Sequence, residues 1–157
     1  MDLWYVMMVI VVGAALALAV QLLWHRARTA QQAAQQELAI LQFGELRQAL
    51  GPAFLEAAAA TGKPRGLRWK QCELEPTELF AIDQATREIV ALVAVTIGFE
   101  AIPGGDMEEV EAVGNLRRAT AVFVYRQREW TTDGRAVFNL EPEQTLQRFA
   151  ESIVPLE

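Results

Sequence analysis

The sequence predicts an α+β protein: a transmembrane helix continuing into a helical neck, then a bent antiparallel sheet of four to five strands and a C-terminal helix. Three observations predict this class. The first is an apolar run over residues 3–24, interrupted only by Gln21. The second is an Ala- and Gln-rich stretch of helical composition. The third is a series of strand-like apolar segments after Gly66, closed by one helical stripe.

The apolar run at residues 3–24 is long enough to cross a bilayer. A helix rises about 1.5 Å per residue, and the hydrocarbon core is about 30 Å thick. Trp4 and Tyr5 lie at one end and Trp24 at the other, where aromatic rings favour the headgroup level. A cleaved signal peptide is the alternative, but the run is too long and no small-residue cleavage site follows it. We therefore expect an uncleaved single-span anchor.

The charges that flank this run predict its orientation. Two arginines follow the run directly, whereas only Asp2 and the α-amino group precede it. Cytoplasmic flanks carry the excess of Lys and Arg, so we expect a cell-membrane protein with its N-terminus outside and its C-terminal domain in the cytoplasm. The residues expected at the membrane interface are Trp4, Tyr5, Trp24, His25, Arg26 and Arg28.

Charge also divides the remainder of the chain. Residues 26–70 carry seven Lys or Arg and three Asp or Glu, whereas residues 71–157 carry seven and sixteen, within a formal net charge of −6. The basic part suits an anionic leaflet, and the acidic part argues against a nucleic-acid partner. Four cations in one connector are candidate contacts for anionic lipid or an acidic partner, with a solvated surface as the alternative: Lys63, Arg65, Arg68 and Lys70.

Residues 25–62 form the predicted neck between the anchor (1–24) and the domain. Ala, Gln, Leu and Glu dominate its first half, where only Gly44 opposes a helix. Gly51-Pro52 is expected to end that helix, and Pro52 to open a second one that stops at Gly62. No heptad persists, so a helix docked on the domain is favoured over a coiled coil.

Residues 63–157 form the predicted cytoplasmic α+β domain. Its strongest strand is residues 88–102, where Ile89 to Val95 are apolar without alternation. Such a run predicts a central strand covered on both faces, with a bend at Gly98. The other expected strands are 67–74 and 79–83, separated by Glu75-Pro76, then 117–125 and 130–140, with hairpin loops at 83–87 and 126–129.

The C-terminal end combines the last strand with a helix. Residues 130–140 alternate well, and we favour one bent strand over a split at Asp133-Gly134. Asn139 is the expected N-cap of the final helix. Four apolar residues recur at helical spacing and predict that this helix covers the sheet: Leu146, Phe149, Ala150 and Ile153.

The residue inventory excludes the common nucleophilic sites. His25 is the only histidine and Ser152 the only serine, and they are expected far apart, which excludes a Ser-His triad. Cys72 has no nearby base, so we expect a structural thiol in a reducing compartment. One Cys and one His cannot make a four-ligand zinc site unless carboxylates supply most of the ligands. The acidic loop lacks the alternating calcium-binding pattern, and its acids are Asp106, Glu108, Glu109 and Glu111. We therefore predict no catalytic, cofactor or metal residue.

Together these observations predict a single-span, non-enzymatic interaction protein. We expect an accessory or assembly subunit of a membrane-associated complex, whose partner is another membrane protein or a second copy. The alternative is a small-ligand-binding, sensor-like domain with a pocket between a curled sheet and a helix. The candidate lining residues of that pocket are aromatic: Trp69, Phe99, Phe123 and Trp130.

Overall fold

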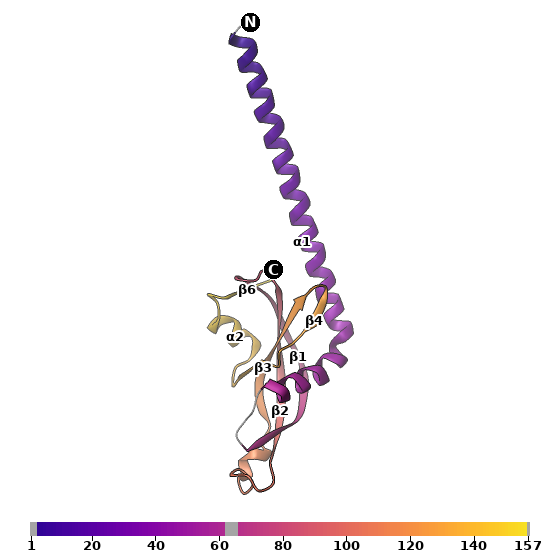
Figure 1. Ribbon diagram of the computed structural model, residues 1–157, viewed down its shortest axis with the longest axis vertical. Coiled ribbons are helices and arrows are strands. Elements are labelled where there is room, and N and C mark those ends of the chain that lie inside the picture. The colour runs from indigo at the N-terminus through magenta and orange to yellow at the C-terminus, as the bar shows by residue number, and fades with distance from the viewer. Residues whose placement is uncertain (1–2, 62–65, 157) are drawn as a thin grey trace. The chain divides into compact units, whose positions relative to one another are not determined.

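The structure is a computed structural model that describes residues 3–61 and 66–156. The chain is α+β, as predicted, with a long helix α1 (Leu3–Thr61) followed by a six-stranded antiparallel sheet and a short helix α2 (Pro142–Arg148), as Figure 1 shows. It forms two compact units, one up to Leu38 and one from Ala39 onward. The strands are β1 (Leu67–Asp83), β2 (Ile89–Ala101), β3 (Arg117–Arg126), β4 (Glu129–Thr131), β5 (Ala136–Phe138) and β6 (Ile153–Pro155), and a 3-10 helix η1 (Glu111–Gly114) lies between β2 and β3.

The first unit consists of α1 up to Leu38. The predicted helix over this part of the chain is confirmed. It contains a window long and apolar enough to cross a membrane, and no residue of that window is buried.

Gly51 and Pro52 do not end the helix as predicted, since α1 continues through both residues to Thr61. A proline inside a helix removes one hydrogen bond and crowds the preceding turn, at a cost of about 3 kcal/mol, and usually bends the helix. Figure 1 shows α1 bending within its C-terminal third. Tertiary packing offsets the cost, because three side chains on the inner side are buried: Leu50, Phe54 and Ala58.

Strand β2 is the centre of the sheet, as its apolar run predicted. The strand order is β4-β3-β2-β1-β6, and β5 also pairs with β3. Residues 89–95 of β2 are buried on both faces. One face packs against residues 39–61 of α1 and is called here the α1 face, and the opposite one, partly covered by α2, is called the α2 face.

Strand β1 is one strand of 17 residues rather than the predicted pair. Its pairing with β2 shifts register between Leu74 and Glu78, so Pro76 lies in a bulge. Among the described residues, only β6 pairs with the outer edge of β1, through Ala81–Asp83. The missing N–H of Pro76 therefore costs no ladder hydrogen bond, which is why an edge strand accepts it.

Residues 130–140 form neither one bent strand nor a hairpin, so the favoured prediction was wrong. Both β4 and β5 pair with β3, and the residues between them bulge away from it. Thr132 holds the bulge, because its hydroxyl donates to the Val122 carbonyl at 2.9 Å and accepts from the Gly134 N–H at 3.1 Å. Gly134, at φ +75°, then packs directly against the backbone of Ala58 in α1.

The C-terminal helix is shorter than predicted. Asn139 adopts a left-handed conformation (φ 61°) and does not cap α2. Glu141 is the N-cap instead, and its N–H donates to the Gln144 side chain at 3.0 Å, half of a capping box. The predicted stripe does not form, because α2 ends before Phe149 and Ile153 pairs with Asp83 as part of β6. Edge pairing with β1 satisfies backbone groups that a longer helix would have left exposed.

The hairpin between β3 and β4 turns on two residues in the left-handed region, Gln127 (φ 52°) and Arg128 (φ 68°). This turn favours Asn-Gly, since other residues are strained there. We expect the double variant Gln127→Asn with Arg128→Gly to be more stable to unfolding by about 1 kcal/mol, measured by thermal unfolding of the full-length protein in mild detergent.

The matched control is the same residue pair in α2, where the backbone is helical. Gln147→Asn with Arg148→Gly should lower stability, because glycine is unfavourable in a helix. Equal shifts of the melting temperature in both double variants would contradict the strain argument.

Candidate functional site

The α1 face of the sheet is filled by an aromatic core. Phe43 of α1 is fully buried and makes edge-to-face contacts with Phe80, Phe123 and Trp130, with ring centroids 5.5, 5.6 and 4.8 Å apart. The indole N–H of Trp130 donates to the Ala39 carbonyl at 2.8 Å. These contacts fix residues 39–61 of α1 on the sheet.

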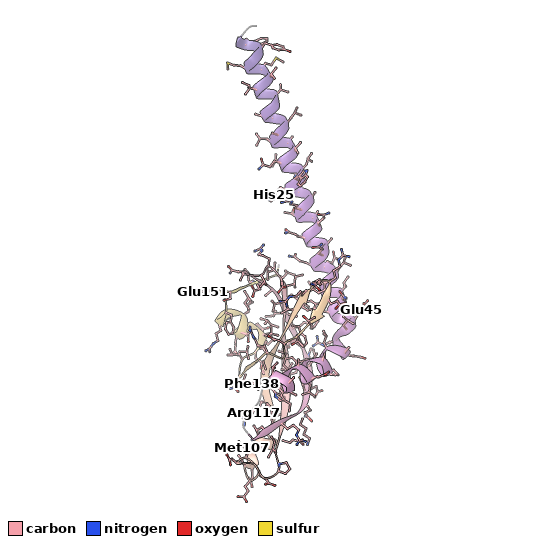
Figure 2. The ribbon with its side chains drawn as sticks, in the orientation of Figure 1. His25, Glu45, Met107, Arg117, Phe138 and Glu151 are labelled. Carbon is pink, nitrogen blue, oxygen red and sulfur yellow. The ribbon has the colours of Figure 1, made fainter. Side chains whose placement is uncertain are left out.

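The four predicted pocket-lining aromatics all belong to this packing. Phe123 and Trp130 are buried in it, and Trp69 contacts the rings of Phe54 and Phe99 at centroid distances of 6.4 and 4.8 Å. Phe99 also borders a shallow hollow of about 310 Å³ at the η1 end of the sheet. Figure 2 shows three other residues of this hollow: Met107, Arg117 and Phe138.

A second hollow is a cleft of about 540 Å³ on the α2 face. Its floor is aliphatic and comes from β2 and β3, where Val90 lies opposite Val124 and Leu92 opposite Val122. Val137 of β5 extends the floor. The walls come from α2, from the start of β6 and from the β1–β2 turn, through Thr145, Phe149, Ile153 and Asp83.

Three polar side chains close to the cleft already have hydrogen-bond partners. The Thr145 hydroxyl donates to the Thr120 hydroxyl at 3.0 Å, and Thr120 donates to the Leu140 carbonyl at 2.7 Å. Asp83 accepts from the N–H groups of Thr86 and Ala85 at 2.8 and 2.9 Å. These hydrogen bonds, that of Thr86 first, hold the pKa of the Asp83 carboxyl below its usual value, and the charge of Arg135 lowers it further.

The residues predicted at the membrane interface all lie on α1 and are exposed. Figure 2 shows His25 projecting from this helix. Arg28 lies over the ring of Trp24, with 5.3 Å between the guanidinium carbon and the ring centroid. This stacking places a cation beside the aromatic ring at one end of the apolar run.

The predicted cationic connector is only partly visible. Lys63 and Arg65 lie outside the described residues, as does the predicted helix cap Gly62. Arg68 is exposed and pairs with Glu100 at 3.5 Å, and Lys70 is exposed on β1. Within the described chain, the connector therefore presents two exposed cations on β1, one of which has a carboxylate partner.

The residues considered for chemistry are scattered. Cys72 is half-buried beside the core, and burial raises the pKa of its thiol to about 11, which leaves it protonated at neutral pH. Ser152 lies in the second unit and His25 in the first. Glu108 of the acidic loop accepts from the Gly104 N–H at 2.8 Å. Among residues 3–61 and 66–156, no group of three or more possible ligands could hold a metal ion.

Sequence reasoning missed the cleft on the α2 face. Its floor residues are the outward-facing half of the apolar runs in β2 and β3, and the signal was therefore present in Val122 and Val124, which alternate with the core side chains. No feature of the sequence indicated that α2 would be too short to cover them.

No protein-family model matches this chain. No curated protein shows significant sequence similarity to it. No solved structure is significantly similar to it either.

Proposed function

We propose that this chain is a single-span membrane protein that acts without catalysis, as an accessory or assembly subunit docking onto a larger membrane complex or a second copy. The observation that carries the proposal is the uncovered apolar part of α1, whose membrane-length window has no buried residue. In water such a surface would aggregate, whereas a bilayer supplies the apolar surroundings it lacks.

The flanks of this apolar run support an orientation with the domain in the cytoplasm. Trp24 and the stacked Arg28 suit the headgroup level at one end, with Arg26 beside them. Trp4 and Tyr5, both exposed, suit the other end. Because the cations follow the run, the positive-inside tendency favours a cytoplasmic C-terminal domain.

The domain itself supports docking better than chemistry. Its half-buried thiol is protonated. Its described carboxylates pair with arginines, accept hydrogen bonds from backbone turns or are exposed to solvent. Glu88, for example, pairs with Arg126 at 2.6 Å, and Arg118 lies 3.1 Å from Glu141. A partner held at the same membrane would meet this domain at high effective concentration, so even a weak contact would suffice for assembly.

Two arginines placed inside the apolar run should remove the chain from the membrane. Val12→Arg with Leu16→Arg puts both charges one turn apart on the same side, at about 2.5–3.5 kcal/mol each near the centre of a span. We expect the variant to be extracted by alkaline carbonate and to lose the partners recovered by affinity isolation from native membranes. Its N-terminus should also stay inside sealed cells, protected from added protease, whereas the wild-type N-terminus is exposed outside.

The matched control carries the same spacing outside the run, Gln31→Arg with Gln35→Arg, and should remain in the membrane with its partners. Removal of residues 1–24 separates two ways of docking: partners lost on truncation bind the span, and partners retained bind the domain. If the wild-type chain is extracted by carbonate, or recovers no partner and runs as a monomer in mild detergent, the proposal is wrong.

A further inference from the structure

The cleft on the α2 face has the dimensions of a ligand site. Its volume of about 540 Å³ lies within the usual range of small-molecule pockets, roughly 300–1,000 Å³. It is bounded by four separate pieces of chain: the floor strands, α2, the start of β6 and the β1–β2 turn. A backbone hydrogen bond of 2.8 Å from the Gln84 N–H to the Ser152 carbonyl ties two of these walls together.

The floor of the cleft selects for an aliphatic ligand. It consists of branched aliphatic side chains, with Phe149 as the only aromatic residue among those that line it. Within the described part of the chain, no buried side-chain nitrogen or oxygen lacks a hydrogen-bond partner. The Thr145 hydroxyl in the cleft wall donates to Thr120, which in turn donates to the Leu140 carbonyl, so neither hydroxyl has a free donor for a polar ligand. A ligand body held here gains from apolar contact.

The mouth of the cleft carries an exposed aromatic ring. Phe149 follows α2 and is 41% exposed, although it borders an apolar hollow. When the ring of Phe149 folds over a bound aliphatic chain, it shields that chain from water. Residues 149–152, which carry the ring, form a turn rather than a helix. Burying this ring adds to the apolar contact available on binding.

The rim of the cleft carries one cation. Arg135 forms no ion pair within 4.0 Å with any described residue. Two acids share the rim. Asp83 accepts hydrogen bonds from two backbone N–H groups, and the nearby charge of Arg135 also lowers the pKa of its carboxyl. Glu151 is exposed, as Arg135 is, and the other lining residues carry no charge. The guanidinium of Arg135 is thus the rim group best able to bind an anionic head.

We infer that this cleft binds an anionic amphiphile, a single aliphatic chain ending in a carboxylate or phosphate, with the chain on the valine floor and the head at Arg135. The inference goes beyond docking and does not depend on which partner the protein binds. A free fatty acid and one chain of an anionic phospholipid share this chemistry, and both are concentrated at a bilayer.

The test uses the full-length protein in phosphatidylcholine nanodiscs, with its Val and Leu methyl groups labelled for NMR. Titration with decanoate should shift the methyl signals of Val90, Val122 and Val124, while those of Val93 and Val95 on the α1 face stay in place. Decanol, which lacks the charge, should bind about tenfold more weakly. A second set of nanodiscs containing phosphatidylglycerol, without decanoate, shows the same shifts if the natural occupant is a phospholipid.

Two variants and one control complete the test. Arg135→Gln should weaken decanoate binding about tenfold and leave decanol binding unchanged, whereas Arg148→Gln, an exposed α2 arginine outside the lining, should change neither. Val122→Trp fills the cleft and should abolish both, with unshifted Val93 and Val95 signals as evidence that the domain remains folded.

The inference is overturned if neither decanoate nor phosphatidylglycerol shifts the cleft methyl signals, or if the shifts spread equally over both sheet faces. It is also overturned if decanol binds as tightly as decanoate, or if Arg135→Gln changes nothing. None of these outcomes bears on membrane anchoring, which the double-arginine variants test separately.

Discussion

Replacing Gly134 by alanine should lower the free energy of unfolding of the second unit by at least about 3 kcal/mol. Two causes combine at this position. Its φ of +75° is strained for any residue with a Cβ, at about 1–2 kcal/mol. An added Cβ would also overlap the backbone of Ala57 and Ala58 in α1, where no side chain can rotate away. Thermal unfolding of the full-length protein in mild detergent, followed by near-ultraviolet circular dichroism, should show a melting temperature lower by at least 10 °C.

Gly44→Ala is the matched control, because a Cβ there meets nothing within 4 Å and the backbone is helical. It should raise stability by about 0.5–1 kcal/mol, the usual advantage of alanine over glycine in a helix. A Gly134→Ala variant as stable as the wild type would show that the bulge between β4 and β5 does not rest on α1 as described.

Truncating Phe43 to alanine should cost about 3–5 kcal/mol of the same unfolding free energy. Phe43 is fully buried and contacts three other rings, so its removal leaves a cavity where α1 meets the sheet. The surrounding rings belong to different strands, which prevents them from closing the space together. The melting temperature should fall by on the order of 10–20 °C.

The control for this variant is Leu41→Ala on the same helix. Leu41 is 61% exposed, so its truncation should change stability by less than about 0.5 kcal/mol. A large loss at Leu41 together with a small loss at Phe43 would indicate that α1 presents a different side to the sheet.

The local part of the fold was readable from the sequence. The uninterrupted apolar run of β2 predicted a central strand, and the alternation of β3 separated Phe123 and Tyr125 on one face from Val122 and Val124 on the other. The β1–β2 turn also forms as predicted, and the Asp83 carboxylate accepts hydrogen bonds from the backbone N–H groups of Ala85 and Thr86 within it. Each of these features depends on neighbouring residues alone.

The features that were mispredicted depend on distant residues. Pro52 stays inside α1 because Phe54 and Ala58 pack on the sheet, and Pro76 stays inside β1 because no described strand covers its edge. The last strand divides because Gly134 meets Ala58. The low propensity of Pro52, Pro76 and Gly134 for regular structure correctly predicted an irregularity in the helix or strand at each position. Tertiary contacts determined whether that irregularity became a break, a bulge or a bend.

The candidate site was the least accessible to sequence reasoning. The sequence placed its pocket among the aromatics, whose rings instead fill the α1 face. The cleft appears on the α2 face because α2 stops at Arg148 and β6 diverts Ile153 to the sheet edge. The apolar spacing over residues 146–153 predicted one continuous helix, and therefore neither the end of α2 at Arg148 nor the strand pairing of Ile153.

The position of Phe43 and Phe54 in the chain has a consequence for biosynthesis. Both belong to α1, which precedes every strand, yet their partners Phe123 and Trp130 lie in β3 and β4. On the ribosome, the helical half of the core therefore emerges first and stays exposed until most of the chain has been made, at about 5–20 residues per second. Nascent chains stalled before β3 should thus bind chaperones, and release past β4 should end that dependence.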